Sequence, residues 1–232
     1  MTDHVSRTPA PLGRTLRHLM GEPVWTGMLA EAYERRHSIG ATLLRQGEPG
    51  THVLALLAGV AKVSRQERNG DVRLLAFRGP GELLGEVAVL DDGVRSASVQ
   101  AISDCTVAVL AKAAFLRFVA ERDLFPVMVR YAMGRLRESD LARTGGDVVP
   151  RLAAALVALA DLSAGAGVAT AGGRRIELAL TRDELAQHLG VSRNTVTAAL
   201  AALAAHRVDA GRKSIAVGDL AALRRAAAAL HG

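Results

Sequence analysis

Two hydrophobic patterns divide the chain near residue 120. Between Ala41 and Leu110, apolar residues form short runs that glycines interrupt. Short apolar runs bounded by turn residues predict β-strands, and many of them in succession favour a β-sandwich or barrel. Examples of the predicted strands are Thr42–Arg45, His52–Ala58, Val60–Ser64, Val72–Phe77 and Ser98–Ile102. Between the third and fourth of these, Asn69-Gly70 predicts a β-hairpin with a type I′ turn, because this dipeptide readily adopts positive φ angles.

Beyond Ala111 the hydrophobic period becomes that of a helix. A short helix is predicted over Ala113–Val119 and a longer one over Leu124–Ala142. Gly145-Gly146 should end or hinge the long helix, and Pro150 suits the first turn of the next, which continues to Leu162. The long helix carries one stripe at steps of three and four: Phe125, Val129, Ala132, Leu136 and Ser139. Because this helix lies between two domains, its stripe predicts a homodimer.

Residues 181–206 carry the signals of a helix-turn-helix. Thr181 with Glu184 fits a capping box at the start of a first helix. Gly190 permits the tight turn, and Ser192 can cap a second helix. The apolar faces of the two helices are predicted to be Leu185, Ala186 and Leu189, and Val196, Leu200 and Leu203. The alternative is an alanine-rich helical hairpin with a solvated polar face.

The second helix presents polar residues to a DNA major groove in this interpretation. Arg193, Asn194 and Thr197 fall on its outward side, where such a helix meets base edges. Residues 207–217 suggest a β-wing whose Arg212 and Lys213 contact phosphates. The complete set expected at DNA is Thr181, Ser192, Arg193, Asn194, Thr195, Thr197, Arg212 and Lys213.

Composition changes this picture only slightly. The chain has 232 residues, half of them apolar, so two modest cores fit. The net charge of +6 is compatible with an anionic partner, although an excess of Arg and Ala reflects compositional bias as readily as function. With neither a long apolar run nor a signal-peptide core, a cytoplasmic protein that avoids membranes is expected.

The single cysteine, Cys105, is expected to be a buried structural thiol. The seven histidines are scattered, with His188 and His206 expected to be exposed, so neither an enzyme nor a metal site is indicated.

Residues 81–99 interrupt the apolar pattern with a polar cassette. Glu86 precedes Arg95 by nine positions, and small residues lie beside both. The simplest interpretation is an ion pair that joins the two sheets of a sandwich. A buried pair of this kind gives little net stability, however, so the two side chains are also candidates for binding a ligand.

Three pieces of sequence in this order resemble the Crp/Fnr family of bacterial transcription factors. They are the Gly-Glu…Arg-Ser-Ala cassette at 85–97, the long helix after it, and Gly-Val-Ser-Arg-x-Thr-Val at 190–196. The resemblance covers roughly residues 22–218. It implies an α+β chain with an N-terminal β jelly-roll cyclic-nucleotide-binding-like domain, a long dimerisation helix and a C-terminal winged helix-turn-helix domain. The expected boundaries are a flexible arm to residue 21, a sensor domain to 121, the dimerisation helix and hinge to 146, and the DNA-binding domain to 232.

The resemblance also implies roles for the cassette. Arg95 would supply its guanidinium to a cyclic phosphate with Ser96 as a further donor, and Glu86 would accept from the ribose 2′-hydroxyl. Gly85 would allow close backbone approach, and a short helix after it would favour the anion. The ligand-binding residues implied in this way are Gly85, Glu86, Val87, Ala88, Arg95, Ser96, Ala97, Arg135, Ser139 and Asp140.

Some positions depart from the family pattern. Ser139 and Asp140 stand where the founding regulator reads adenine with a Thr-Ser pair, and the connection that follows Asp140 is about three residues shorter. In the second helix, Asn194 replaces an acidic base reader and Ala198 replaces an arginine. An amide suits adenine, whereas a carboxylate suits cytosine, so a different operator is expected.

The resulting expectation is a dimeric regulator that binds a double-stranded DNA operator and is gated by cyclic AMP or another cyclic nucleotide. RNA polymerase is the expected protein partner, and no further cofactor is implied. Two alternatives remain. One is a ligand-independent DNA-binding dimer with a degenerate sensor pocket, which Asp140 favours and the intact Glu86, Arg95 and Ser96 oppose. The other is an enzyme of cyclic-nucleotide chemistry.

Overall fold

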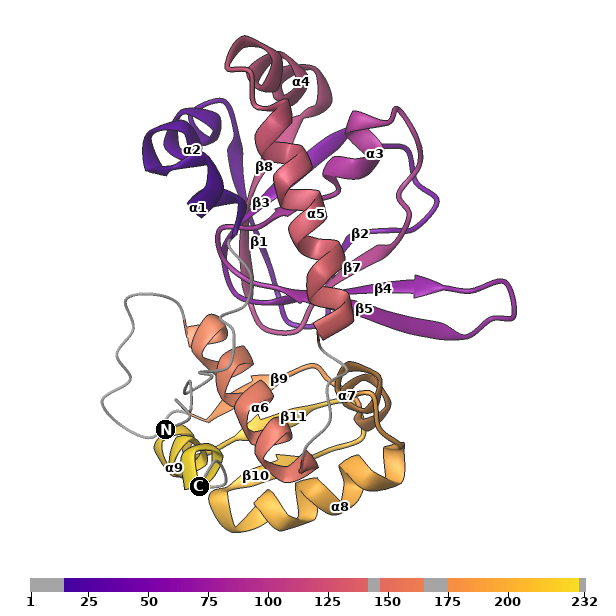
Figure 1. Cartoon of the computed structure of the whole chain (residues 1–232), viewed down its shortest axis with the longest axis vertical. Helices are drawn as coiled ribbons and strands as arrows, with labels where there is room; N and C mark the ends of the chain where they lie inside the picture. Colours follow the sequence, from indigo (N-terminus) through magenta and orange to yellow (C-terminus); the bar gives the residue numbers. More distant parts are fainter. Residues whose placement is uncertain (1–14, 142–146, 165–174, 230–232) are drawn as a thin grey trace, which may run out of the picture.

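Two four-stranded antiparallel sheets form the N-terminal domain in a computed structural model that describes residues 15–141, 147–164 and 175–229 (Figure 1). One sheet has the strand order β1-β8-β3-β6 and the other β2-β7-β4-β5. Apolar side chains from both sheets fill the space between them, as in the predicted jelly roll. The strands are β1 (Tyr33–His37), β2 (Thr42–Leu44), β3 (His52–Ala58), β4 (Ala61–Gln66), β5 (Val72–Arg78), β6 (Leu83–Leu84), β7 (Ser98–Ala101) and β8 (Cys105–Ala111).

Cys105 lies in the core between the sheets, as predicted. The residue is 2% exposed, and its sulfur lies 3.4 Å from the carbonyl oxygens of Val60 and Ser103, which share its single thiol proton. Burial raises the pKa of this thiol to about 11. Since the thiolate is the reactive form, Cys105 is a packing residue.

The hydrophobic pattern missed the first strand, β1. This strand lies at the edge of its sheet, pairs with β8, and has four exposed residues among its five. With little buried surface, it shows no alternation of apolar and polar residues. Edge position therefore hides the strand from a reading of hydrophobicity.

Helices cover the outer face of the β1-β8-β3-β6 sheet and share a core with it. They are α1 (Leu16–Met20), α2 (Glu22–Leu29), α4 (Lys112–Glu121) and α5 (Phe125–Leu141), while the short α3 (Glu86–Leu90) lies within the cassette. The predicted flexible arm to residue 21 is wrong at its end, because Leu16 and Met20 are buried in this core. Their burial anchors α1 to the sensor domain.

The hairpin between β4 and β5 forms where Asn69-Gly70 predicted it, but with a different turn. Gly70 has φ +89°, whereas Asn69 is not among the residues with positive φ in the described chain. The Gly70 amide donates to the Glu67 carbonyl at 3.0 Å, and the Glu67 amide donates to the Asp71 carbonyl at 2.8 Å. This pattern fits a turn closed by one glycine in the left-handed region rather than type I′.

The C-terminal domain is a winged helix-turn-helix. Its elements are α6 (Val148–Ala164), β9 (Ile176–Leu178), α7 (Arg182–Leu189), α8 (Arg193–Leu203), a 3₁₀ turn (Ala204–His206), β10 (Val208–Ala210), β11 (Ile215–Val217) and α9 (Leu220–Ala229). The wing strands form a three-stranded sheet in the order β10-β11-β9. The short strand β9 was not predicted from the sequence, because it has only three residues.

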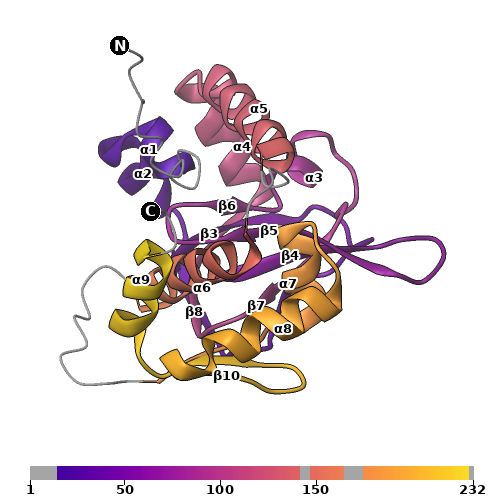
Figure 2. The ribbon, with the colours of Figure 1, turned by 60° about the horizontal axis from the view of Figure 1, so that its bottom comes forward.

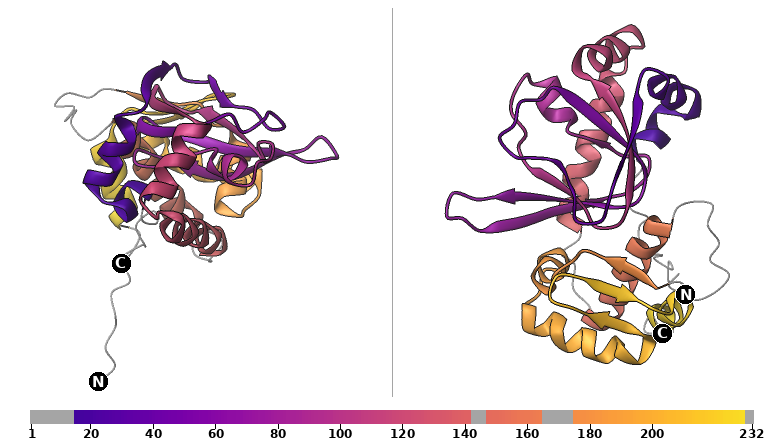
Figure 3. Two further views of the ribbon diagram at one scale, coloured as in Figure 1. Left: turned by 90° about the horizontal axis from the view of Figure 1, so that it is seen from above. Right: turned by 180° about the vertical axis from the view of Figure 1, so that it is seen from behind.

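A small apolar patch of the N-terminal domain joins the core of the C-terminal domain. Leu74 and Phe77 of β5 belong to the same buried cluster as Leu185 of α7. Figure 2, in which the C-terminal domain is turned forward, shows α7 beside β4 and β5. Figure 3 shows the tip of the β4–β5 hairpin extending beyond the body of the molecule. The contacts with α7 run along β5 from Phe77, near the base of the hairpin, to Val72, the first residue after the turn.

Candidate ligand pocket and DNA-binding surface

The cassette borders a cavity of about 150 Å³ in the N-terminal domain. Its walls come from the β2-β7-β4-β5 sheet, from β6 and α3, and from the segment before β7. The lining residues are Leu44, Val63, Leu75, Arg78, Leu83, Leu84, Gly85, Glu86, Val87, Ala88, Arg95, Ser96, Ala97 and Val99. Most are apolar, and the polar ones converge from the cassette and β5, which is the usual composition of a small-molecule site.

Arg95 is the most deeply buried charge of this cavity. Arg95 is only 3% exposed, and its two terminal nitrogens donate to the backbone carbonyls of Gly85 and His52. Burial lowers the pKa of Arg95, with Glu86 and Glu48 opposing that change, but a guanidinium remains charged. Gly85 has φ +80°, and a Cβ there would collide with the Arg95 Nη1 atom. Only glycine at position 85 therefore accommodates this placement of the guanidinium.

Glu86 does not form the simple ion pair with Arg95 that the sequence left open. Among the described residues, no carboxylate lies within 4.0 Å of the Arg95 guanidinium. Burial raises the pKa of Glu86, and Glu82 adds to the rise while Arg78 and Arg135 oppose it. The carboxyl lines the cavity together with Arg95, so its oxygens are candidates for hydrogen bonding to a ligand.

The structure brings seven of the ten predicted ligand-binding residues together around the cavity, those from Gly85 to Ala88 and from Arg95 to Ala97. Their binding of a ligand stays a prediction. Ser139 and Asp140 lie in α5, and their side chains are outside the described residues, as is the expected short connection after them. The sequence reading missed the walls from β4 and β5, including Arg78. Alternation along the predicted strands was the available signal for those residues.

Arg135 lies in a different polar cluster from the one predicted. It forms an ion pair with Glu82, and its guanidinium lies 4.6 Å from the centre of the Tyr131 ring. The Tyr131 hydroxyl also donates to Glu82, and burial, followed by the nearby Glu82 charge, raises the pKa of that phenol. Arg135 is not among the lining residues of the cavity. This cluster ties α5 to the segment that leads into the cassette.

The helix-turn-helix has the local geometry that its sequence predicted. Thr181 and Glu184 form a complete capping box at the start of α7, and Gly190 ends that helix with φ +66°. Ser192 caps α8 by accepting from the Thr195 amide at 3.1 Å. These contacts define the ends of both helices and the turn between them, which favours a helix-turn-helix over an unspecialised helical hairpin.

The outer face of α8 is exposed and polar. Arg193, Asn194 and Thr197 are all exposed, while Val196 and Leu200 face the core. The Thr197 hydroxyl donates to the Arg193 carbonyl at 2.9 Å, and the Thr195 hydroxyl pairs with that of Ser192. Arg193 and Asn194 are therefore the residues with the greatest freedom to reach a base edge.

The wing presents its two predicted cations in the turn between β10 and β11, where Arg212 and Lys213 are exposed. Arg182, which the sequence reading did not single out, holds this turn in place. It donates to the carbonyls of Gly211 at 2.7 Å and Ala210 at 2.8 Å. The wing is thus attached to the start of α7 and moves with the helix-turn-helix.

A jelly roll whose cavity combines apolar walls with a buried arginine, joined to a winged helix-turn-helix, defines a class of protein: a sensor domain fused to a DNA-binding domain. Comparison with known families agrees. Residues 34–122 match the cyclic nucleotide-binding domain, and residues 150–226 match the Crp-like helix-turn-helix domain. The chain belongs to the Crp/Fnr family of bacterial DNA-binding transcription regulators.

Curated relatives cover most of the chain. The CRP-like cAMP-activated global transcriptional regulator of Mycobacterium tuberculosis is 32% identical over 196 residues, which is 81% of this chain and 85% of the relative. The cyclic AMP receptor protein of Thermus thermophilus is 31% identical over 198 residues, which is 80% of this chain and 87% of the relative. These proteins align with both domains, so the similarity extends across the whole two-domain arrangement.

Solved structures show the same fold. A transcriptional regulator of the CRP/FNR family from Thermus thermophilus has a TM-score of 0.54 at 25% identity and covers 85% of this chain and 100% of its own. The c-di-GMP responsive global regulator of Xanthomonas campestris has a TM-score of 0.57 at 21% identity and covers 85% and 99%. The predicted α+β architecture is confirmed.

Two features, a membrane-spanning helix and a metal site, are both absent from the described ranges 15–141, 147–164 and 175–229. Within them no helix is long and apolar enough to cross a membrane. Nor do these ranges contain three or more His, Cys, Asp or Glu side chains placed to hold a metal ion.

Proposed function

We propose that this regulator is gated by a cyclic nucleotide bound in the jelly-roll cavity. The observation that carries the proposal is Arg95: a residue 3% exposed, at the edge of a cavity, whose guanidinium has neutral backbone carbonyls as its hydrogen-bond partners. A buried charge is costly without a counter-charge, and a cyclic phosphate supplies one. Glu86 lines the same cavity, and its carboxyl oxygens can accept from a ribose hydroxyl. The remaining cassette residues then contact the ligand as the resemblance implies.

The relatives support the chemical class of this ligand. The Mycobacterium tuberculosis relative is named as cAMP-activated and the Thermus thermophilus relative as a cyclic AMP receptor. Cyclic AMP is therefore the first effector to test. In a calorimetric titration of the full chain with cyclic AMP, cyclic GMP and cyclic di-GMP, we expect one to bind, and that nucleotide to change the affinity for operator DNA. Operator binding with no response to any of the three would instead favour a ligand-independent regulator.

We propose that the chain works as a homodimer through α5. One face of this helix packs on the sensor domain through the buried Met128 and Tyr131, next to Leu124, which is buried just before the helix begins. The opposite face presents Phe125, Val129 and Met133, which are 50%, 62% and 48% exposed. An apolar helix face of this kind is suited to pairing with its copy, since large apolar side chains are otherwise costly to leave in water. Leu136 continues the predicted stripe, but its side chain lies outside the described residues.

Val129→Asp should convert the dimer to a monomer, because it places a charge in the centre of the α5 pair. Sedimentation velocity at micromolar concentration measures the change. Arg130→Asp is the matched control, since Arg130 is exposed on the same helix but away from the apolar stripe. A wild-type monomer, or a variant as dimeric as wild type, contradicts the proposal. Loss of dimerisation should also weaken DNA binding, since two recognition helices read half-sites about 34 Å apart.

The remaining expectations follow from DNA binding and are proposed with it. The chain acts in the cytoplasm, where a bacterial chromosome lies, and meets RNA polymerase at its operators. It performs no catalytic step. The domain boundaries are those expected from the sequence, except that the sensor domain begins with α1 instead of after it.

A further inference from the structure

The two faces of the β4–β5 hairpin contact different parts of the protein. Val63 of β4 and Leu75 and Arg78 of β5 line the ligand cavity. Lys62 of β4 and Leu74 and Phe77 of β5 instead contact the C-terminal domain. Successive side chains of a strand point to opposite faces, and a bulge at Leu75 shifts this alternation so that Leu74 and Phe77, three residues apart, share the outer face. One two-stranded ribbon therefore separates the cavity from α7. A ligand that displaces the side chains on the inner face, toward the cavity, therefore also moves those on the outer face, toward α7.

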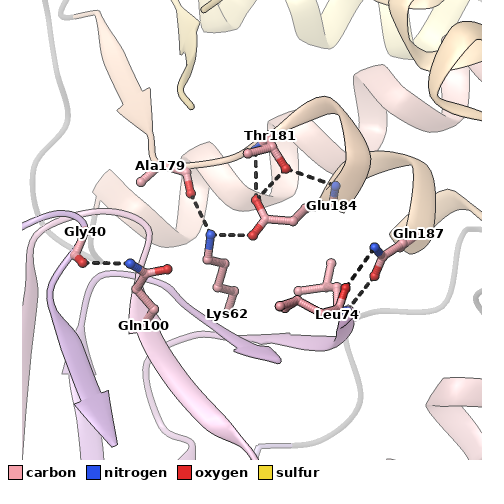
Figure 4. Close-up of polar contacts among 9 residues, drawn as sticks. Gly40, Lys62, Leu74, Gln100, Ala179, Thr181, Glu184 and Gln187 are labelled. Atoms are coloured by element: carbon pink, nitrogen blue, oxygen red, sulfur yellow. Dashed lines mark hydrogen bonds and ion pairs between the residues drawn. The ribbon is translucent and has the colours of Figure 1, made fainter. Parts of the chain in front are cut away.

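Lys62 makes the central polar contact on the outer face (Figure 4). Its ammonium lies 2.5 Å from a carboxylate oxygen of Glu184 and 3.4 Å from the carbonyl of Ala179. The side chains of Lys62 and Glu184 are 10% and 16% exposed. The other oxygen of Glu184 accepts from the Thr181 amide at 2.8 Å within the capping box. One carboxylate thus starts the first helix of the DNA-binding motif and also holds that helix to the sensor domain.

Gln187 makes the second contact by binding the backbone of β5. Its side-chain oxygen accepts from the Leu74 amide at 2.5 Å, and its side-chain nitrogen donates to the Val72 carbonyl at 3.2 Å (Figure 4). Because β5 is the edge strand of its sheet, these backbone groups are free to bind a partner. The amide of Gln187 takes the place of a neighbouring strand's peptide group, so the contact is specific for the register of β5.

An aromatic contact completes the docking surface and corrects the prediction for His188. This side chain is half-buried, with its ring 4.9 Å from that of Phe77 in an edge-to-face arrangement. Burial lowers the pKa of His188, and Arg151 adds to the effect. The whole surface combines a small apolar patch with an ion pair and hydrogen bonds. Polar interfaces of this kind between domains usually form and break reversibly.

We propose that Lys62 and Gln187 are positioning residues through which the occupancy of the cavity sets the placement of the helix-turn-helix. The hairpin is the shared wall: its inner face senses the ligand, and its outer face holds α7 through Lys62–Glu184 and Gln187–Leu74. The coupling to a nucleotide rests on the function proposed above. The docking of α7 by these two side chains does not, and it is tested without any ligand.

The ligand-free test uses hydrogen exchange of the full-length chain, since the Leu74 amide is held by Gln187 itself. Lys62→Met and Gln187→Met keep most of the side-chain stems but remove the polar groups. Both should speed exchange in the segments of β5 and α7 about tenfold. Arg65→Met is the matched control, because Arg65 carries the same charge on the same hairpin and pairs with Glu67. Exchange equal to wild type in both variants would overturn the docking role.

The coupling test measures operator affinity with and without cyclic AMP. In wild type, the ratio of the two affinities reports the coupling free energy. In Lys62→Met and Gln187→Met the ratio should move toward one, and Arg65→Met should retain the wild-type ratio. A merely structural role would instead shift both affinities by the same factor, leaving the ratio unchanged, and that result overturns the proposal. If wild type binds no cyclic nucleotide, the proposed gating fails, and hydrogen exchange still decides the docking role.

Discussion

Arg95→Ala should weaken cyclic-nucleotide binding by about 2–3 kcal/mol, which is roughly a 30- to 150-fold loss of affinity. The guanidinium of Arg95 is almost fully buried at the cavity and has spare donors beyond those given to Gly85 and His52. Its contact with a cyclic phosphate would be charge-assisted and shielded from water, where such contacts are strongest. Calorimetric titration with cyclic AMP, cyclic GMP and cyclic di-GMP measures the loss.

Two further variants separate recognition from folding. Arg95→Lys keeps the positive charge but loses the planar fork, so it should bind more weakly than wild type and more tightly than Arg95→Ala. Arg45→Ala removes an equal charge from an exposed residue that is not among those lining the cavity, and it should bind as wild type does. Thermal melting checks that Arg95→Ala remains folded. Equal nucleotide affinity in wild type and Arg95→Ala would show that the cassette has only a structural role.

Arg193→Ala should cost about 1–3 kcal/mol on the operator and relax the preference at one base pair. Arg193 is exposed at the first position of α8, and its nearest acidic partner is Asp183, at 3.6 Å. Both members of that pair are well exposed, so the pair is weak and Arg193 can exchange it for a guanine. Binding to the operator and to scrambled DNA across a salt series measures both effects.

Lys213→Ala is the contrasting variant, because Lys213 lies in the wing turn and should contact phosphate alone. It should weaken operator and scrambled DNA alike and reduce the slope of log affinity against log salt by roughly one. If Arg193→Ala weakens both DNAs equally, Arg193 is a phosphate anchor as well. Sequence would then be read by Asn194, since the Thr197 hydroxyl is bonded to its own helix.

Local sequence signals were sufficient for much of the fold and for the DNA-binding motif. The capping box of Thr181 and Glu184, the left-handed Gly190 and the Ser192 cap formed as predicted, because each depends on residues within one helical turn. The turn at Asn69-Gly70 was placed correctly but assigned the wrong type, since one positive φ at Gly70 was enough to close it. The edge strand β1 was missed because it buries little.

The candidate ligand site divides in the same way. The sequence placed Glu86, Arg95 and their small neighbours in one cassette, since all lie within a short segment. It did not reveal that Arg95 binds backbone carbonyls instead of Glu86, or that Arg135 pairs with Glu82. Partner choice among several charges depends on which side chains approach within hydrogen-bond distance, and a one-dimensional pattern does not contain those distances.

By itself, the sequence determined the order of elements, the family resemblance and the residues with suitable chemistry, because hydrophobic period, caps and turns act over a few residues. Only the tertiary structure decided which partners those residues have. The clearest case is Lys62, which a strand pattern assigns to no role, yet which lies 2.5 Å from Glu184 across 122 positions of sequence. The packing of two domains creates that contact, since burial and electrostatic attraction depend on distance in space.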